Sequence, residues 1–397
     1  MWILRLLILL SALTIPAIAS PAVAAPFAGL HDVERERQAI HDQVSEAIAK
    51  KDFTGLNRMA RDLRIRRART SGGTWKLADF YASLAFDLRP DRIEGQCRND
   101  AAPFVRSWAA AAPAEPAAHI VEARLLIEHA WCFRGAGDAD SVSPEAWPLF
   151  RRNVDAALKV LDARNRAAAI DPEYYAVMEE IYLYQGRGKA EFRRLLDTGV
   201  AREPYYYSLY FQALRYYQPQ WHGSNEEADA LARYAAEHTK QEDGLGAYAR
   251  VYWYATQCNC GLDHTGIDKL TMRQAMRDVI TRHPSDWNAA NFAKLACQIG
   301  DGNDAAVYLG MIRPDDGSVW DDQRKWQACV KLAGYSGNVA RQWQSAFPGP
   351  VDPSALPGAG VRSTERCASS MLEHWSAAEV ATYCGAIVDG QGHTPVK

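Results

Sequence analysis

The sequence predicts an all-α protein built from stacked antiparallel helix pairs, a tetratricopeptide-like right-handed α-solenoid. Helix signals recur along nearly the whole chain, whereas sustained alternation of apolar and polar residues, the mark of a half-buried strand, is absent. Alanine and leucine are frequent and β-branched residues are scarce. The expected helices are roughly ten to twenty residues long and are joined by short Gly or Pro turns, so we expect neighbouring helices to stack side by side.

Helix starts and ends are legible in the chain. Asp171 and Ser143 each precede a proline, which is typical of an N-cap with proline in the first helical turn. Ser224 and Ser376 each begin an S-x-x-E capping box. Apolar residues recur at helical spacing in two segments, one that ends before Gly135 and one that ends before Gly300: Ile120, Ala123, Ile127, Ala130 and Trp131; Ala289, Phe292, Ala293, Ala296 and Ile299.

The segment 288–312 looks like one tetratricopeptide hairpin. Its small and aromatic residues at packing positions are Phe292, Ala293, Gly300, Asp301 and Ala306. Periodicity elsewhere is irregular, which indicates a degenerate solenoid. We divide the chain into a signal peptide (1–25), an N-terminal helical region (26–137), a helical-repeat region (138–346), and a Pro/Gly-rich linker with a short disulfide-bracketed tail (347–397).

The N-terminal segment has the pattern of a secretory signal peptide. Arg5 supplies a positive charge, residues 3–13 form an apolar run too short to span a bilayer comfortably, and Ala22 with Ala24 forms an A-x-A cleavage site. Cleavage is expected near Ala24 or Ala25, and the protein is expected to be periplasmic or secreted. No later segment is apolar for long enough to suggest a membrane helix.

Composition excludes several classes of partner. The 397 residues are 48% apolar and 10% aromatic, enough for a large core, and the formal net charge of -3 comes from intermixed charges. The chain has no basic stripe for nucleic acid and no acidic tail. Its one cationic run, residues 61–69, is expected to form a solvated helix face rather than a site for an anionic partner.

Eight cysteines in an exported protein favour disulfides. We expect Cys97 to pair with Cys132 and Cys367 with Cys384. The other four allow three pairings, among which the sequence cannot choose: Cys258, Cys260, Cys297 and Cys329. We favour Cys297 with Cys329, because their separation is close to one helical-hairpin repeat, and this choice leaves Cys258 facing Cys260.

Cys258, Cys260 and His264 form the sharpest chemical cluster in the sequence. Two thiols and an imidazole so close together suit a soft metal, and the two thiols alone suit redox cycling. A structural bridge is the favoured interpretation, because reactive dithiols more often have two intervening residues and lie at a helix N-terminus. We therefore expect no metal and no cofactor.

Several motifs, taken in order, resemble a known family. They are the segment 69–77 with Phe80 and Tyr81; Trp108 with Pro113; Ala130, Trp131, Arg134, Gly135 and Gly137; and Tyr206 with Pro219, Trp221, Gly223 and Ser224. Over residues 33–312 the chain is similar to the bacterial proteins grouped as domain of unknown function 4034. The resemblance implies a helical fold and supplies no catalytic residue. Gln220 stands where that family usually has Arg, and His222 replaces a common Gly.

The candidate binding residues are aromatic. Tyr206, Tyr210 and Tyr217 share one helical face, and Trp253 belongs to a second aromatic cluster. Such a stripe is more often a seam between packed helices, but if it were exposed it would be our first choice of binding surface for a peptide or sugar.

Two turns are candidate ligand sites. The loop that holds Trp221 and His222 precedes a helix N-terminus, which suits an anionic or glycan ligand, although helix capping and packing explain the same residues. The turn with Arg134, Gly135 and Gly137 has the same two interpretations, an anion nest or a helix ending.

Motifs of the common hydrolases, zinc proteases and nucleotide-binding enzymes are missing. Glu179 and Glu180, the carboxylates with a conceivable glycosidase role, point in different directions on a helix, so we expect surface or capping charges. The sequence therefore favours an exported helical scaffold that binds a protein or peptide partner in the cell envelope through a concave helical surface. The alternative is an envelope enzyme, either a thiol redox protein using Cys258 and Cys260 or a glycan-acting protein.

Overall fold

The computed structural model describes residues 30–334, apart from 94–95, 258–266, 313–318 and 321–322. Most of its helices lie side by side in one long row. Four helices precede this row: α1 (Leu30–Lys50), α2 (Phe53–Arg66), α3 (Lys76–Leu88) and α4 (Ala102–Ala111). The row consists of α5 (Pro116–Arg134), α6 (Ala146–Ala168), α7 (Pro172–Tyr184), α8 (Lys189–Arg202), α9 (Ser208–Tyr217), α10 (Asn225–Asp243), α11 (Gly246–Gln257), α12 (Lys269–Arg282), α13 (Asp286–Gln298), α14 (Gly302–Met311) and α15 (Gln323–Leu332). A short 3-10 turn, η1 (Ala139–Ser141), lies between α5 and α6. The described part of the chain is thus mostly helical.

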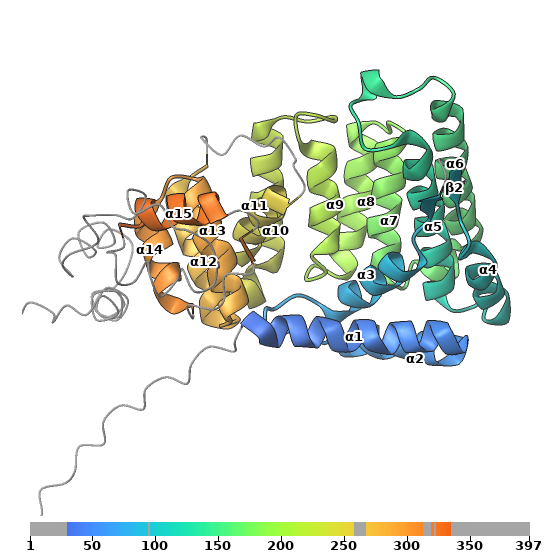
Figure 1. The fold of residues 1–397 in the computed structure, drawn as a ribbon, viewed down its shortest axis with the longest axis horizontal. Coiled ribbons are helices and arrows are strands. Elements are labelled where there is room, and N and C mark those ends of the chain that lie inside the picture. The colour runs from blue at the N-terminus through green and yellow to red at the C-terminus, as the bar shows by residue number, and fades with distance from the viewer. Residues whose placement is uncertain (1–29, 94–95, 258–266, 313–318, 321–322, 335–397) are drawn as a thin grey trace, which may run out of the picture.

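Helices that follow one another in the sequence pack against one another. α5 lies along α6, α10 along α11, and α13 along α14, while α7 contacts both α8 and α9. Figure 1 shows α5 to α13 as a row of upright helices. None of the described helices is long and apolar enough to cross a membrane.

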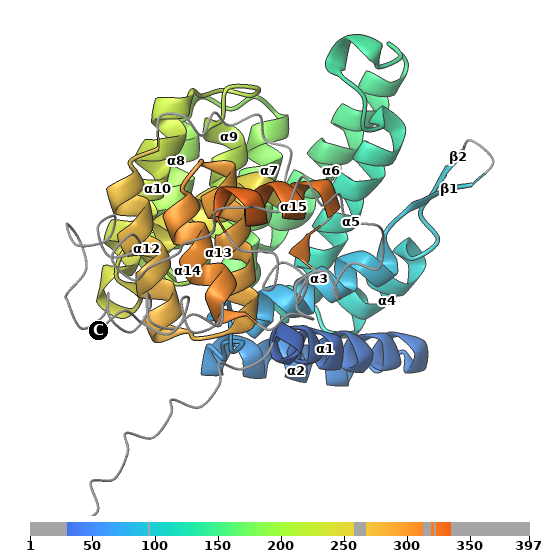
Figure 2. The ribbon, with the colours of Figure 1, turned by 60° about the vertical axis from the view of Figure 1, so that its left-hand side comes forward.

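The N-terminal helices lie across this row rather than within it. Figures 1 and 2 both show α1 and α2 along the lower ends of the upright helices. α1 packs on α3 and also contacts α13, near the far end of the row. The N-terminal segment therefore joins helices that are distant from one another in the sequence.

The helix caps largely follow the sequence signals. Asp171 caps α7 by accepting a hydrogen bond from the backbone N–H of Glu173 (3.1 Å), and Ser224 caps α10. Gly135 and Gly300 follow α5 and α13 with φ of 76° and 70°, the left-handed region that glycine tolerates. The cap expected at Ser143 is displaced, because α6 begins at Ala146 and Ser143 lies in the preceding turn.

A short antiparallel hairpin, absent from the sequence prediction, precedes α4. Its strands are β1 (Asp91–Ile93) and β2 (Gln96–Arg98), each only three residues long, which is too short for an alternating pattern to register. Cys97 in β2 forms a disulfide with Cys132 near the end of α5. A second disulfide joins Cys297 in α13 to Cys329 in α15, so the described cysteines pair as the sequence analysis expects.

Two carboxylates lie in the core, contrary to the sequence expectation. Glu179 and Glu180 in α7 are 0% and 5% exposed rather than surface charges. Glu180 forms ion pairs with Arg124 of α5 and Arg215 of α9, so its charge is balanced from both neighbouring helices. Neither carboxylate oxygen of Glu179 has a hydrogen-bond partner among the described residues, and burial raises the pKa of Glu179 well above the usual range.

Some predictions concern residues outside the described part of the chain. These are the signal peptide, the linker and tail with Ser376 and the Cys367–Cys384 pair, and the cluster of Cys258, Cys260 and His264.

Candidate functional site

The cationic run of the sequence binds the protein's own helix turns. We call residues 61–75, which end α2 and lead into α3, the strap. Its arginines form ion pairs with acidic residues at successive inter-helix turns: Arg61 with Glu115, Arg64 with Asp171, Arg67 with Glu203, and Arg69 with Glu242 and Asp243. The expectation of a solvated face holds for Arg61 and Arg67, whose side chains are 51% and 59% exposed, but not for Arg64 and Arg69, which are 12% and 18% exposed. We call the edge of the row that the strap covers the closed edge.

Asp243 is the most heavily engaged acid of the closed edge. Its side chain is 2% exposed, and Oδ1 lies 3.0 Å from Arg69 Nη1 and 2.9 Å from His283 Nε2. The Tyr207 hydroxyl donates to Oδ2 at 2.7 Å. Burial by itself would raise the pKa of Asp243, but the hydrogen bond from His283 and the charge of Arg69 outweigh it and lower the pKa to about 2.

The opposite edge of the row is not covered by the strap. We call it the open edge; its turns are residues 135–145, 185–188 and 218–224. The open edge holds a pocket of about 500 Å³. A second pocket, of about 590 Å³, lies between α1, α3 and α13. We call the pocket of the open edge the aromatic pocket, because its walls carry aromatic side chains from α5, α6, α7 and the turn after α9: Trp131, Trp147, Phe150, Tyr184 and Trp221.

The rings of the aromatic pocket hold one another in place. Phe150 and Tyr184 each make edge contacts with Trp131, at centroid distances of 5.7 and 5.4 Å. Trp221 lies 5.9 Å from Tyr184 in a tilted arrangement. Such offset and edge geometries are the preferred ones for aromatic pairs, so the walls are rigid without a bound ligand.

Polar groups reach the pocket from three elements. Arg134 lies over the Trp131 ring, 4.8 Å from its centroid, and its Nη1 donates to the backbone oxygens of Gly135 and Gly137. Arg215 donates to Glu180 Oε1 at 2.9 Å. Gln218 lines the pocket and is 1% exposed, yet its Oε1 has no hydrogen-bond partner among the described residues.

Glu180, the acid that pairs with Arg215 of the aromatic pocket, keeps its negative charge at neutral pH. Burial alone would raise the pKa of Glu180, but the charges of Arg124 and Arg215 outweigh it and hold the pKa below its usual range. Glu180 is therefore an ionised structural partner at neutral pH. A general acid for glycoside cleavage needs the opposite, a raised pKa.

The structure brings parts of two separately predicted sites together and leaves His222 outside them. Trp221 and the turn of Arg134 and Gly137 line the same aromatic pocket. His222 instead packs on Tyr216, with ring centroids 4.8 Å apart.

The tyrosine stripe forms no exposed groove. Tyr206 and Tyr210 are both 0% exposed and lie in the seam between helices, so neither can serve as a binding residue. Tyr217 is half-buried against Phe192, and Trp253 is half-buried and donates to Asn291. The interpretation of the stripe as a packing seam therefore holds for its buried members.

Sequence reasoning did not single out several residues of the aromatic pocket: Trp147, Phe150, Tyr184, Arg215 and Gln218. Their common signal is position, because each lies within about two turns of a helix end at the open edge. That signal appears only when the direction of every helix in the row is known.

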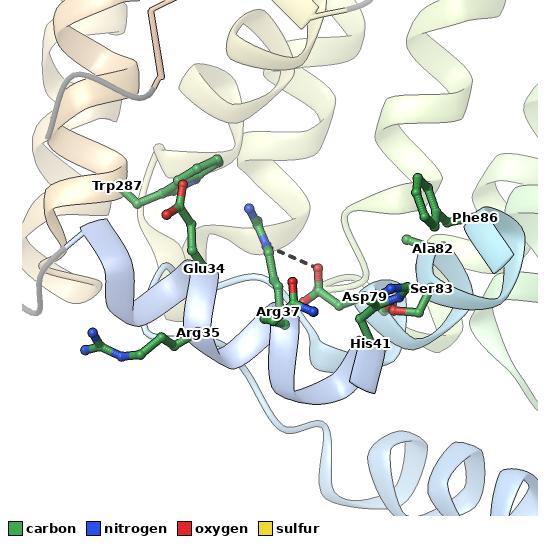
Figure 3. Close-up of a pocket in the computed structure, with 10 residues that line it drawn as sticks. Glu34, Arg35, Arg37, His41, Asp79, Ala82, Ser83, Phe86 and Trp287 are labelled. Carbon is green, nitrogen blue, oxygen red and sulfur yellow. Dashed lines mark hydrogen bonds and ion pairs between the residues drawn. The ribbon is translucent and has the colours of Figure 1, made fainter. Parts of the chain in front are cut away.

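A second cavity, the α1–α3 groove, lies between these two helices and α13. Figure 3 shows Arg37 of α1 in its centre, between Trp287 of α13 and Asp79 of α3. The Arg37 guanidinium stacks 4.6 Å from the Trp287 ring centroid, and its Nε lies 3.2 Å from Asp79 Oδ1. Phe86, 58% exposed, lines the groove from α3. Burial raises the pKa of Asp79 to about 6.

Comparison with family models, curated proteins and solved structures gives no match to this chain. The resemblance to domain of unknown function 4034 therefore stays a prediction from the sequence. Among the described residues, no group of His, Cys, Asp and Glu is arranged to hold a metal ion.

Proposed function

We propose that this protein is an exported scaffold of the cell envelope, a tetratricopeptide-like right-handed α-solenoid that binds a partner protein. The α1–α3 groove receives an extended peptide segment of that partner. The packing of consecutive helices in one row and the two described disulfides support this proposal.

The observation that carries the proposal is the composition of the α1–α3 groove. Exposed aromatic rings and an arginine are the side chains that dominate the binding energy of protein interfaces. Here Phe86 and Trp287 lie on opposite sides of Arg37 (Figure 3). The Phe86 side chain is largely exposed, and this exposure contributes nothing to folding. Two apolar anchors with a polar centre suit a peptide that presents side chains on both sides of a backbone amide.

The centre of the groove suits that amide. Asp79 Oδ2 is buried without a hydrogen-bond partner among the described residues, so it accepts from a peptide N–H once a local side-chain movement exposes it. The Arg37 guanidinium carries five N–H donors, of which the contact with Asp79 uses one, and another can donate to a peptide carbonyl. One donor beside one acceptor matches a backbone amide in an extended segment.

Photo-crosslinking in the exporting cells tests the proposal. A photoreactive phenylalanine analogue replaces Phe86, and in a matched control it replaces Leu270, an apolar residue of α12 that is 50% exposed. We expect a discrete protein adduct at position 86 that exceeds the adduct at position 270. Trp287→Ala should reduce it severalfold, because it removes one anchor and the ring under Arg37.

Adduct yields that are equal at the two positions, or that Trp287→Ala leaves unchanged, would refute the groove as the partner site. Far-UV circular dichroism of Trp287→Ala checks that the fold persists. Asp79→Asn serves as a second variant of similar shape, because it keeps the side-chain volume and removes the carboxylate acceptor. It should weaken the adduct less than Trp287→Ala does.

A further inference from the structure

The aromatic pocket is lined by more aromatic rings than the α1–α3 groove. Like the groove, it contains a buried acceptor without a partner among the described residues, here Gln218 Oε1. Leaving a buried acceptor unsatisfied costs about 1–3 kcal/mol. A fold retains such a group when a ligand or water donates to it.

The pocket offers hydrogen-bond donors and an acceptor at the same time. Arg134 and Arg215 are donors only, and Gln218 Oε1 is an acceptor. A hydroxyl group both donates and accepts, so neighbouring hydroxyls on one ligand satisfy both kinds of group. Beside these polar groups lies the ring of Trp221, which suits a ligand with an apolar face.

We infer that the aromatic pocket binds a hexopyranose unit of a glycan, with the sugar ring packed on Trp221 and its hydroxyls bonded to Gln218 and the pocket arginines. A pyranose has apolar C–H faces and a rim of hydroxyls, which is the combination that the pocket complements. The volume of about 500 Å³ lies within the range of about 300–1,000 Å³ that is typical of small-ligand sites.

A simple anion fits the pocket less well. The charge of Arg215 is balanced by Glu180, which lies 2.9 Å away, and Arg134 already donates to two backbone oxygens. Asp138 on the rim adds a negative charge. The pocket thus lacks the surplus positive charge that phosphate or carboxylate ligands need.

An extended peptide also fits less well, because it needs an open groove with free ends. The aromatic pocket is instead lined by residues that converge from α5, α6, α7 and the turn after α9.

Tryptophan fluorescence of the purified mature chain tests this inference. The probes are chitotetraose, cellotetraose, maltotetraose and muropeptides released from peptidoglycan by lysozyme. We expect a saturable change with at least one probe. Trp221→Ala should weaken that binding about tenfold or more, or about 1.4 kcal/mol, whereas Trp221→Phe keeps a ring face and should lose less.

Trp287→Ala, which alters the distant α1–α3 groove, is the matched control and should bind the sugar as the native chain does. No saturable change with any probe would overturn the inference, and so would equal affinity of Trp221→Ala. If a pool of proline-containing peptides binds instead, and Trp221→Ala abolishes that binding, the pocket is a peptide site and the sugar assignment is wrong. Trp221→Ala should leave crosslinking at position 86 unchanged, so this inference and the partner-binding proposal fail separately.

Discussion

The two edges of the helix row differ in how their turns are satisfied. On the closed edge the strap brings arginines to the acidic residues of successive turns, and the pairs of Arg64 with Asp171 and of Arg69 with Asp243 are largely buried. On the open edge no comparable segment covers the described turns. There, aromatic rings form a pocket and Gln218 Oε1 has no partner among the described residues. The comparison shows that the turns of the closed edge are paired with the strap, whereas the open edge keeps a pocket with a buried acceptor that has no partner among the described residues.

The difference also explains why two similar sequence features have opposite roles. Arg69 follows α2 and Arg134 ends α5, and glycines come shortly after each arginine in the sequence. Arg69 reaches Asp243 across the molecule, whereas Arg134 bonds to the oxygens of its own turn. The long-range partner makes the first arginine part of the fold. The lack of one leaves the second at the surface of a pocket.

Removal of Asp243 should have the largest effect on stability. Asp243→Ala leaves Arg69, His283 and the nearby Arg250 without their shared buried partner, and breaking a buried ion pair costs about 3–5 kcal/mol. Urea denaturation measures the loss in free energy of unfolding. Glu242→Ala is the matched control, because it removes the neighbouring partner of the same arginine.

Glu242 is 54% exposed, so its pair with Arg69 should contribute no more than about 1 kcal/mol. Similar losses for the two variants would show that the closed edge is a solvated ion-pair surface. In that case the proposed contrast between the edges fails.

Two glycines with positive φ, one at each edge, allow the backbone constraints of the two edges to be compared. Gly73 in the strap has φ of 91°, and a Cβ there would lie 2.6 Å from the His283 ring and 2.7 Å from Arg250 Nη2. Gly135 on the open edge has φ of 76° and no atom near an added Cβ. Gly73→Ala should cost about 3–4 kcal/mol, from strain and overpacking together.

Gly135→Ala should cost less, about 1–3 kcal/mol, because its backbone conformation, with φ of 76° and ψ of 176°, is its sole penalty. Thermal and urea unfolding of both variants measure this difference. Equal costs would mean that the strap moves away from α12 without loss, and that the closed edge is loosely packed.

The pH dependence of stability should separate two acids of the closed edge. Burial raises the pKa of Asp171 from 3.8 to about 6, despite the nearby charge of Arg64. An acid whose folded pKa is raised adds stability that is fully present below pH 3.8 and is lost as the pH rises through 6. At about 1.36 kcal/mol per unit, the shift of about 2 units corresponds to about 3 kcal/mol.

The free-energy difference between the native chain and Asp171→Asn should therefore shrink by about 3 kcal/mol between pH 3 and pH 7. Asp243→Asn should show the opposite sign, because the pKa of Asp243 is lowered to about 2. Its contribution is present above pH 3.8 and is lost as the pH falls through 2. Urea titrations at several pH values test both. A flat difference for Asp171→Asn would show that Arg64 fully compensates the burial.

Local features of this fold could be predicted from the sequence, and long-range ones could not. The caps at Asp171 and Ser224 and the helix ends at Gly135 and Gly300 depend on neighbouring residues alone, and the structure confirms them. Arg69 and Asp243 are far apart in the chain, and nothing in a helix pattern indicates that a loop will cross the row to join them.

The candidate site was only partly predictable for the same reason. Trp221 and Arg134 were recognised as separate turns, but their meeting in one pocket depends on the alternating direction of the intervening helices. The tyrosine stripe was ambiguous because a seam and a groove have the same helical spacing, and burial decides between them. Glu180 appeared to be a surface charge because its arginine partners lie on other helices.

The smallest expected effect on stability is at Gln218, where the open edge meets its proposed ligand. Gln218→Met keeps the length of the side chain and removes the buried Oε1 that has no partner among the described residues. Because that oxygen has a desolvation penalty, the variant should be as stable as the native chain or more stable by up to about 1 kcal/mol. Urea denaturation measures this change, and the same variant should bind the sugar probe less tightly. A loss of stability above about 1 kcal/mol would show that the oxygen has a partner inside the fold, such as a buried water. A stable variant with weakened binding would instead show that the fold tolerates an unsatisfied acceptor at this edge because the ligand requires it.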